Sequence, residues 1–133
     1  MVAAARSVLW PRAMSEFASL DRCAAYVAVR SLLIAVEGVA VGWPTPLADR
    51  ACRASMAAVE LTAEAIAHDP TSAGRRRCLR DAITSVIVIA AAVDIARLNG
   101  IGGARLDDVQ RVAGRSVALL AMFLHANAAP YPR

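Results

Sequence analysis

Apolar positions recur along the chain in four long segments, separated by short stretches rich in Gly, Pro and polar residues. Their spacing of three and four residues predicts helices over about 17–41, 47–68, 75–99 and 106–126. The separating stretches carry the residues that end helices, with prolines at 44 and 46 and glycines at 74, 100, 102 and 103. Four helices of similar length joined by short links predict an all-α fold, an up-down-up-down antiparallel four-helix bundle.

The predicted helix ends carry residues suited to capping. A Ser or Thr side chain accepts a hydrogen bond from the first turn, and an Asn-Gly pair suits a helix C-terminus. In chain order, the expected caps are Ser15 or Ser19, Thr45 followed by Pro46, Thr71 or Ser72, and Asn99-Gly100. The bundle then spans 17–126, between a flexible N-terminal arm (1–16) and a loose C-terminal tail (127–133).

The centre of the third segment, residues 82–93, carries no charged residue. Twelve residues are too few to cross a bilayer, which needs about 20, and too many for one half-exposed helix face. We therefore expect a helix, with Ile87 inside, that neighbours surround on nearly every side. Within it, the β-branched run TSVIVI (84–89) alone would suggest a strand. Helical sequence continues on both sides without a turn signal, so the prediction remains a helix.

Composition adds an argument for self-association. The 133 residues suffice for one domain with a real core, and 58% of them are hydrophobic but only 5% aromatic. A mean hydropathy of +0.48 is high for a small monomer. No uncharged run reaches 18 residues, which argues against a membrane protein. We expect a homo-oligomer that buries the apolar excess between its own copies.

Charge and cysteine content indicate partner class and compartment. The net charge is +4, and all 15 basic residues are Arg, which permits an acidic partner such as nucleic acid. The three cysteines form no CxxC pair and are expected to be buried thiols in a reducing compartment. The first 15 residues lack the extended apolar region of a signal peptide. Together these features predict a cytoplasmic protein.

The strongest candidate for phosphate binding is the cluster Arg75, Arg76, Arg77 and Arg80 at the start of the third helix. Cations there oppose the helix dipole, so either local acidic residues or a bound phosphate must compensate them. A solvated patch with local acidic partners is the competing interpretation. Two further pairs, Arg50 with Arg53 and Arg111 with Arg115, either extend a basic stripe or form solvated faces. Arg105 is expected to pair locally with Asp107 or Asp108.

Other chemistry finds little support in the sequence. Glu60, Glu64 and His68 share one face of the second helix, but no other helix offers a matching ligand set, so no metal site is predicted. No nucleophile with a His partner and no Gly-rich phosphate loop occurs. Aromatic residues that stack on bases are scarce. We therefore predict a protein that is not an enzyme and has no cofactor.

Several short motifs suggest a family. Ala63-Glu64-Ala65 resembles an Ala-Glu-Gly signature, and Asp94-Ile95-Ala96-Arg97 with Gly100 resembles a Glu-Ile-Ala-Lys element and its closing Gly. With Gly114-Arg115, Arg53-Ala54 and the Phe17 opening, the chain resembles the four-helix-bundle proteins of 23S rRNA intervening sequences. These are related to the accessory variability proteins of diversity-generating retroelements. The resemblance covers about residues 17–124, and Val59 and Leu61 depart from the Pro and Asn common in the family.

The resemblance implies a homopentameric ring with a basic surface and, in the retroelement branch, binding to nucleic acid and to a reverse transcriptase. It brings no catalytic residues. The predicted function is that of a non-enzymatic, oligomeric accessory protein that binds the RNA or DNA backbone. The alternative is a structural bundle that assembles with itself or docks a protein partner without binding nucleic acid.

Overall fold

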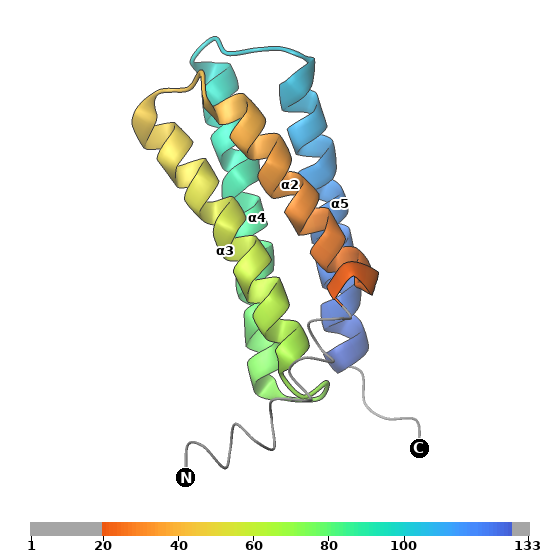
Figure 1. The fold of residues 1–133 in the computed structure, drawn as a ribbon. Coiled ribbons are helices and arrows are strands. Elements are labelled where there is room, and N and C mark those ends of the chain that lie inside the picture. Colours follow the sequence, from red (N-terminus) through yellow and green to blue (C-terminus); the bar gives the residue numbers. More distant parts are fainter. Residues whose placement is uncertain (1–19, 129–133) are drawn as a thin grey trace.

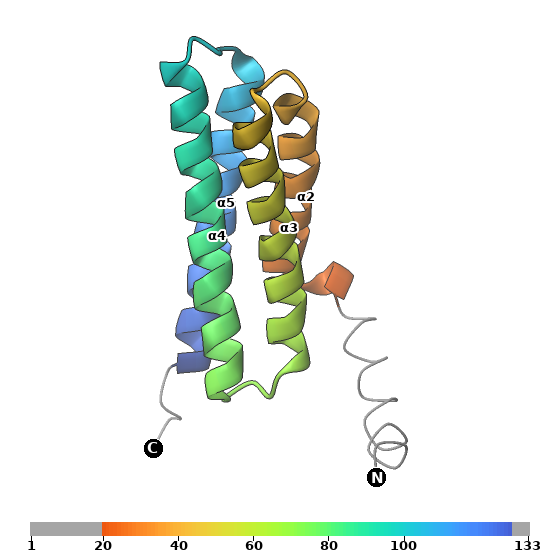
Figure 2. The same cartoon turned by 90° about the vertical axis from the view of Figure 1, so that its left-hand side faces the viewer.

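The computed structural model describes residues 20–128, which form a four-helix bundle (Figure 1). A short 3-10 turn, η1 (Leu20–Arg22), precedes the helices α2 (Ala24–Ala40), α3 (Thr45–Ala67), α4 (Ala73–Leu98) and α5 (Ala104–Ala128). Helix α2 packs on α3 and α5, and α4 packs on the same two neighbours. Short loops make each helix antiparallel to the next, as the turned view also shows (Figure 2). The predicted up-down-up-down bundle is confirmed.

The first helix begins later than predicted. Cys23 has an extended backbone (φ −85°, ψ 112°) and separates η1 from α2, so the helix starts at Ala24. The predicted start at Phe17, the caps Ser15 and Ser19 and the flexible arm lie outside the described residues. The last helix continues to Ala128, past its predicted end at 126, and the remainder of the predicted tail also lies outside the described residues.

The other helix ends show which predicted caps form. Helix α3 starts at Thr45, two residues before the predicted start at 47. Pro44 stands in the capping position, so the predicted cap Thr45 is wrong. After α4, Gly100 has a φ of +81°. Its N–H donates to the Arg97 carbonyl, and the Ile101 N–H donates to the Ala96 carbonyl. This is a Schellman turn, whose left-handed residue is usually glycine.

Ser72 is the predicted cap with the clearest hydrogen bond. Its hydroxyl accepts from the Arg75 backbone N–H at 3.1 Å, at the first turn of α4. Replacing Ser72 with Ala should lower the free energy of unfolding by about 1 kcal/mol, because one first-turn donor loses its partner. Chemical denaturation measures this change. Thr71→Ala is the matched control, and an equal loss in both variants would contradict the assignment of Ser72 as the cap.

The core uses small residues where helices meet closely and branched residues at the centre. Ala51, Ala58 and Ala65 are fully buried on α3, which packs more extensively on α4 than on any other helix. Small side chains allow this close approach. The larger fully buried apolar residues come from the other three helices and include Leu32, Leu79, Val86, Ile89, Val109 and Leu120. Small side chains thus line much of the buried face of α3.

Helix α4 is not surrounded on nearly every side, contrary to the prediction. Ile87 is 55% exposed and Leu98 87% exposed in the single chain, and Ile95 is also exposed. A bundle covers only the inward face of each helix, so the opposite face of α4 stays open. The β-branched run 84–89 is helical, as predicted. Among the described residues, no helix is long and apolar enough to cross a membrane.

Candidate nucleic-acid interface

Arg75, the first member of the predicted phosphate-binding cluster, lies inside the protein. The residue is only 9% exposed to solvent. The guanidinium Nε donates to the Ala65 carbonyl at 2.7 Å, and Nη2 donates to the Ile66 carbonyl at 3.1 Å. The guanidinium also stands 5.1 Å from the centre of the Phe123 ring, a distance suited to a cation–π contact. Arg75 therefore closes the C-terminus of α3 and is not available to a phosphate.

This position explains how an arginine is tolerated at the start of α4. A cation opposes the dipole of its own helix at the N-terminus. The same cation is favourable at the C-terminus of the antiparallel α3, where the last carbonyls carry partial negative charge. The sequence alone predicts compensation by acidic side chains or by a phosphate. The compensation observed here comes from backbone carbonyls.

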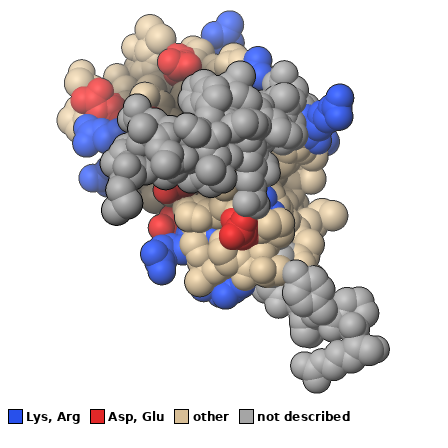
Figure 3. Space-filling view, turned by 60° about the horizontal axis from the view of Figure 1, so that its bottom comes forward, with Lys and Arg blue, Asp and Glu red and all other residues tan. Residues whose placement is uncertain are grey.

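The other three members of the cluster differ in availability. Arg76 is half-buried and donates from Nη1 to the Thr71 carbonyl at 2.9 Å. Arg77 and Arg80 are exposed. Both basic and acidic patches are visible from this end of the bundle (Figure 3). Within the cluster, Arg77 and Arg80 are therefore the two exposed arginines.

Arg50 and Arg53 do not join that cluster in a single chain. Both are exposed in the first half of α3, where they line a hollow with Pro46 and Asp49. The arginines of α4 lie beside the opposite, C-terminal end of α3. At about 1.5 Å of rise per residue, Arg50 is separated from that end by about 25 Å along the axis. The two predicted basic groups are thus separate.

A third basic group forms where the first and last helices of the bundle meet. Arg22 from η1 and Arg111 and Arg115 from α5 line one open groove with Ala24, Val27, Ala28, Ser31 and Val112. We call these residues the α2–α5 groove. Arg111 has an acidic neighbour, with its Nη2 3.6 Å from Asp108 Oδ1, and both side chains are mostly exposed. No described residue forms an ion pair with Arg22 or Arg115.

A separate hollow lies toward the other end of these two helices. It is lined by Ile34, Gly38, Arg105 and Asp108, among others. The predicted pairing of Arg105 with Asp107 or Asp108 is not observed. Asp107 instead pairs with Arg97, and Asp108 pairs with Arg111. Arg105 is consequently an exposed cation on the same side of the molecule.

Arg111 and Arg115 form a predicted pair on one helix, but the sequence pattern does not connect them with Arg22. Their separation along the chain hides the grouping. The predicted topology contained a usable signal, because the first and last helices of an up-down-up-down bundle are neighbours. To tell which residues of α2 and α5 lie side by side, one needs to know where α2 begins. The predicted start of that helix was too early.

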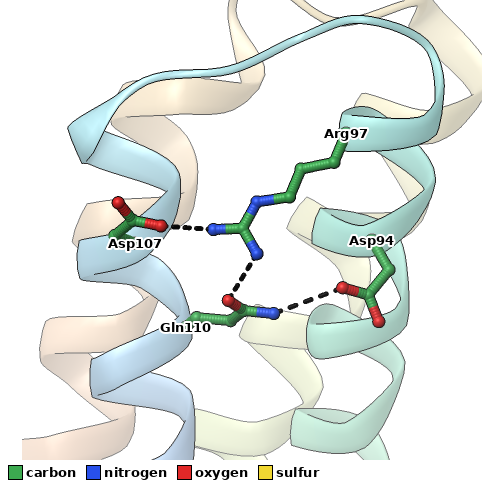
Figure 4. Close-up of polar contacts among 4 residues, drawn as sticks. All are labelled: Asp94, Arg97, Asp107 and Gln110. Atoms are coloured by element: carbon green, nitrogen blue, oxygen red, sulfur yellow. Dashed lines mark hydrogen bonds and ion pairs between the residues drawn. The ribbon is translucent and has the colours of Figure 1, made fainter.

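The residues of the Asp94-to-Arg97 motif take part in a contact between helices. Arg97 on α4 pairs with Asp107 and donates from Nη1 to Gln110 Oε1 at 2.6 Å, both on α5 (Figure 4). Gln110 in turn donates to Asp94 at 3.3 Å. The network is exposed, so each link contributes little to stability. Its main consequence is that Arg97 is already engaged and does not extend a basic surface.

The described cysteines are free thiols that differ in burial. Cys78 is buried, and Cys23 and Cys52 are half-buried. Burial raises the pKa of the Cys52 thiol, with Glu37 and Asp49 adding to the effect. Cys78 lies beside Glu64 and His68, a set of potential metal ligands drawn from two helices. The sequence places Glu64 and His68 on one helix face but does not indicate Cys78 as the third member.

No protein-family model, curated protein or solved structure matches the chain. The resemblance to the proteins of 23S rRNA intervening sequences therefore stays a prediction from the sequence.

Proposed function

We propose that the protein binds the phosphate backbone of nucleic acid in the α2–α5 groove. The observation that carries this proposal is the convergence of Arg22, Arg111 and Arg115 on one groove. Guanidinium groups bind phosphate oxygens through two parallel hydrogen bonds, and release of condensed counterions adds to the affinity. Two of these three arginines lack an acidic partner among the described residues, so their charge is available to a ligand.

The dimensions and chemistry of the groove suit a backbone rather than bases. From Arg105 to Arg115, the exposed arginines of α5 extend over about 15 Å of helix, enough for more than one phosphate. Among the residues that the structure describes, the groove is lined by Ala, Val, Ser and Arg and by no aromatic side chain. Base stacking needs aromatic platforms. Binding should therefore depend on charge and salt and very little on sequence.

The biological role follows from the predicted resemblance. We propose a non-enzymatic accessory protein that binds RNA or DNA as a homo-oligomer, a pentamer in the related families, and assists a reverse transcriptase. Symmetry would repeat the α2–α5 groove on every copy, so that modest local charge adds up around the assembly. The exposed Arg77 and Arg80, and Arg50 and Arg53, would add secondary contacts. A reverse transcriptase gene beside the coding sequence would support this role.

The test compares three double variants that each remove two positive charges. These are Arg111→Gln with Arg115→Gln, Arg77→Gln with Arg80→Gln, and Arg50→Gln with Arg53→Gln. Titration of labelled duplex DNA and structured RNA at low salt measures the affinity. We expect the groove pair to cause the largest loss for both ligands. Equal losses from all three pairs would contradict a defined interface and indicate diffuse attraction.

A second candidate function, docking of another protein surface, is favoured by the exposed apolar face of α4. Ile87, Ile95 and Leu98 lie on the side of α4 that faces away from the bundle core. Such a face on a soluble bundle is typical of an interaction surface. A second copy of the chain is the simplest occupant, and it agrees with the apolar excess of the composition. This candidate is compatible with nucleic-acid binding by the opposite side.

The role of Ile87 in assembly has a direct test. Burial in a single chain would make Ile87→Asp destabilising by several kcal/mol, but the observed exposure removes that expectation. We expect the variant to fold with nearly unchanged stability and to dissociate, because a buried interface does not accommodate an unpaired carboxylate. Light scattering after size exclusion measures the mass. Met122→Asp, also exposed, is the control. A wild-type monomer at micromolar concentration would contradict the assembly.

A further inference from the structure

Three side chains with different metal-ligand atoms meet at the α3–α4 turn. Glu64 stands in the last turn of α3, His68 follows its end, and Cys78 lies in the second turn of α4. A carboxylate oxygen, an imidazole nitrogen and the Cys78 sulfur all lie within 4.8 Å of one another. The four-residue spacing puts Glu64 and His68 on one face of α3. The antiparallel return of the chain brings Cys78 to that face.

The surrounding contacts fix this arrangement before any ligand binds. The backbone N–H of His68 donates to the carbonyls of Glu64 and Ala65, both at 3.2 Å. Arg75 joins the start of α4 to the end of α3 through its hydrogen bonds to Ala65 and Ile66. The two elements that carry the ligands are therefore held together by contacts that do not involve the ligands themselves.

Gly74 provides a second, independent observation. The His68 ring lies so close to it that a Cβ atom at position 74 would be 2.7 Å from Cε1 and 2.8 Å from Nδ1 of the imidazole. Any larger residue would push the ring away from the start of α4. The φ angle of Gly74 is not in the left-handed region, so backbone conformation does not require glycine there. The space left by Gly74 is occupied by the imidazole, which is thereby kept beside Cys78 and Glu64.

We propose that Glu64, His68 and Cys78 bind a zinc ion, with water as the fourth ligand. Thiolate, imidazole and carboxylate are the three donor types that zinc accepts, and three protein ligands with one open position are a common zinc arrangement. The thiolate excludes calcium and magnesium, which prefer oxygen. Tetrahedral bonds of about 2.0–2.3 Å bring donor atoms to roughly 3.5 Å apart, so the ligands must move slightly closer. Glu64 is exposed and free to make most of that movement.

Binding exchanges a proton for the metal. Burial raises the pKa of the Cys78 thiol, and the Glu64 carboxylate, which accepts its hydrogen bond, raises it further. Asp81 acts in the same direction and Arg77 opposes them. When zinc binds, the Cys78 sulfur loses its proton to solvent and forms a bond to the metal, while Glu64 turns from the thiol to the ion. Two anionic ligands then balance the charge of Zn²⁺, and affinity should increase with pH.

Cobalt(II) is the spectroscopic probe for this site. The full chain, prepared without a histidine tag and stripped of metal, should bind one Co²⁺ per chain. It should show sulfur-to-cobalt charge transfer and the visible bands of tetrahedral cobalt, and zinc should displace the cobalt. Zinc should also raise the melting temperature, and a chelator should reverse that increase, because the ion joins α3 to α4.

Matched variants identify the ligands. Cys78→Ala should abolish the charge-transfer band, and Cys52→Ala should keep it. Glu64→Gln should weaken binding by at least about 10-fold, since even loss of a residue that only orients a ligand costs about 10–100-fold. Glu60→Gln, one turn earlier on α3, should leave it unchanged. Because Glu64 is exposed, this pair remains decisive if Cys78→Ala does not fold. The absence of a charge-transfer band in the wild type, or equal effects of the two Glu variants, would overturn the proposal.

Discussion

Replacing Arg75 with Met is expected to lower the free energy of unfolding by about 3 kcal/mol and the melting temperature by roughly 10 °C. The side chain donates to the Ala65 and Ile66 carbonyls and contacts the Phe123 ring, so it connects α3, α4 and α5. Met retains much of the apolar volume but leaves two carbonyls at a helix end without a charged donor. Loss of such a donor costs more than loss of a neutral one. Urea denaturation followed by circular dichroism measures the change.

Arg77→Met is the matched control for this prediction. It makes the same substitution two residues along the helix at an exposed position, where surface changes are usually worth less than about 0.5 kcal/mol. The free energy of unfolding should therefore separate the two variants clearly. If Arg75→Met were as stable as Arg77→Met, the guanidinium would not hold the end of α3, and the exclusion of Arg75 from the nucleic-acid interface would lose its basis.

Replacing Arg115 with Glu is expected to weaken nucleic-acid binding by roughly 10-fold or more, because it removes one phosphate contact and adds a repulsive charge. Arg115 lines the α2–α5 groove without an acidic neighbour, whereas Arg111 is partly neutralised by Asp108. Arg115→Gln should consequently weaken binding more than Arg111→Gln. Fluorescence anisotropy with labelled duplex DNA at fixed low salt measures each affinity.

Removing the competing carboxylate should have the opposite effect. Asp108→Asn should strengthen binding, because Arg111 is then released to the phosphate and a repulsive charge is lost. Glu60→Gln changes the net charge by the same amount on α3, away from the groove, and should have a smaller effect. If both variants strengthened binding equally, net charge rather than the groove would determine affinity.

The fold could be predicted from the sequence because its signals are local and agree with one another. Apolar spacing fixed the helices, and the turn residues around Pro44, Ser72 and Gly100 fixed the links. The flanking helical sequence outweighed the β-branching of residues 84–89. The exposed face of α4 could not be predicted in the same way, because apolar content does not reveal whether neighbours come from the same chain or from another copy.

The candidate sites depend on contacts between helices, and these were harder to predict. Arg75 and Arg77 look alike in the sequence, yet one points into the bundle and the other into solvent. Residues two apart on a helix lie on nearly opposite faces, so the orientation of α4 toward α3 decides which of the two arginines points inward. Cys78 joins Glu64 and His68 for the same reason, since its distance from them depends on the α3–α4 turn. Periodicity places a residue on a face but does not identify the residue opposite.

The salt dependence of binding tests the central claim most directly. The observed association constant for duplex DNA should fall as the salt concentration increases. If three arginines each neutralise one phosphate, the plot of its logarithm against the logarithm of salt concentration should have a slope of about −2.7 or steeper. The variant with Arg22, Arg111 and Arg115 all changed to Gln should flatten the slope by about that amount while keeping its helical content. No binding by the wild type at low salt, or the same slope in both proteins, would contradict nucleic-acid binding by the α2–α5 groove.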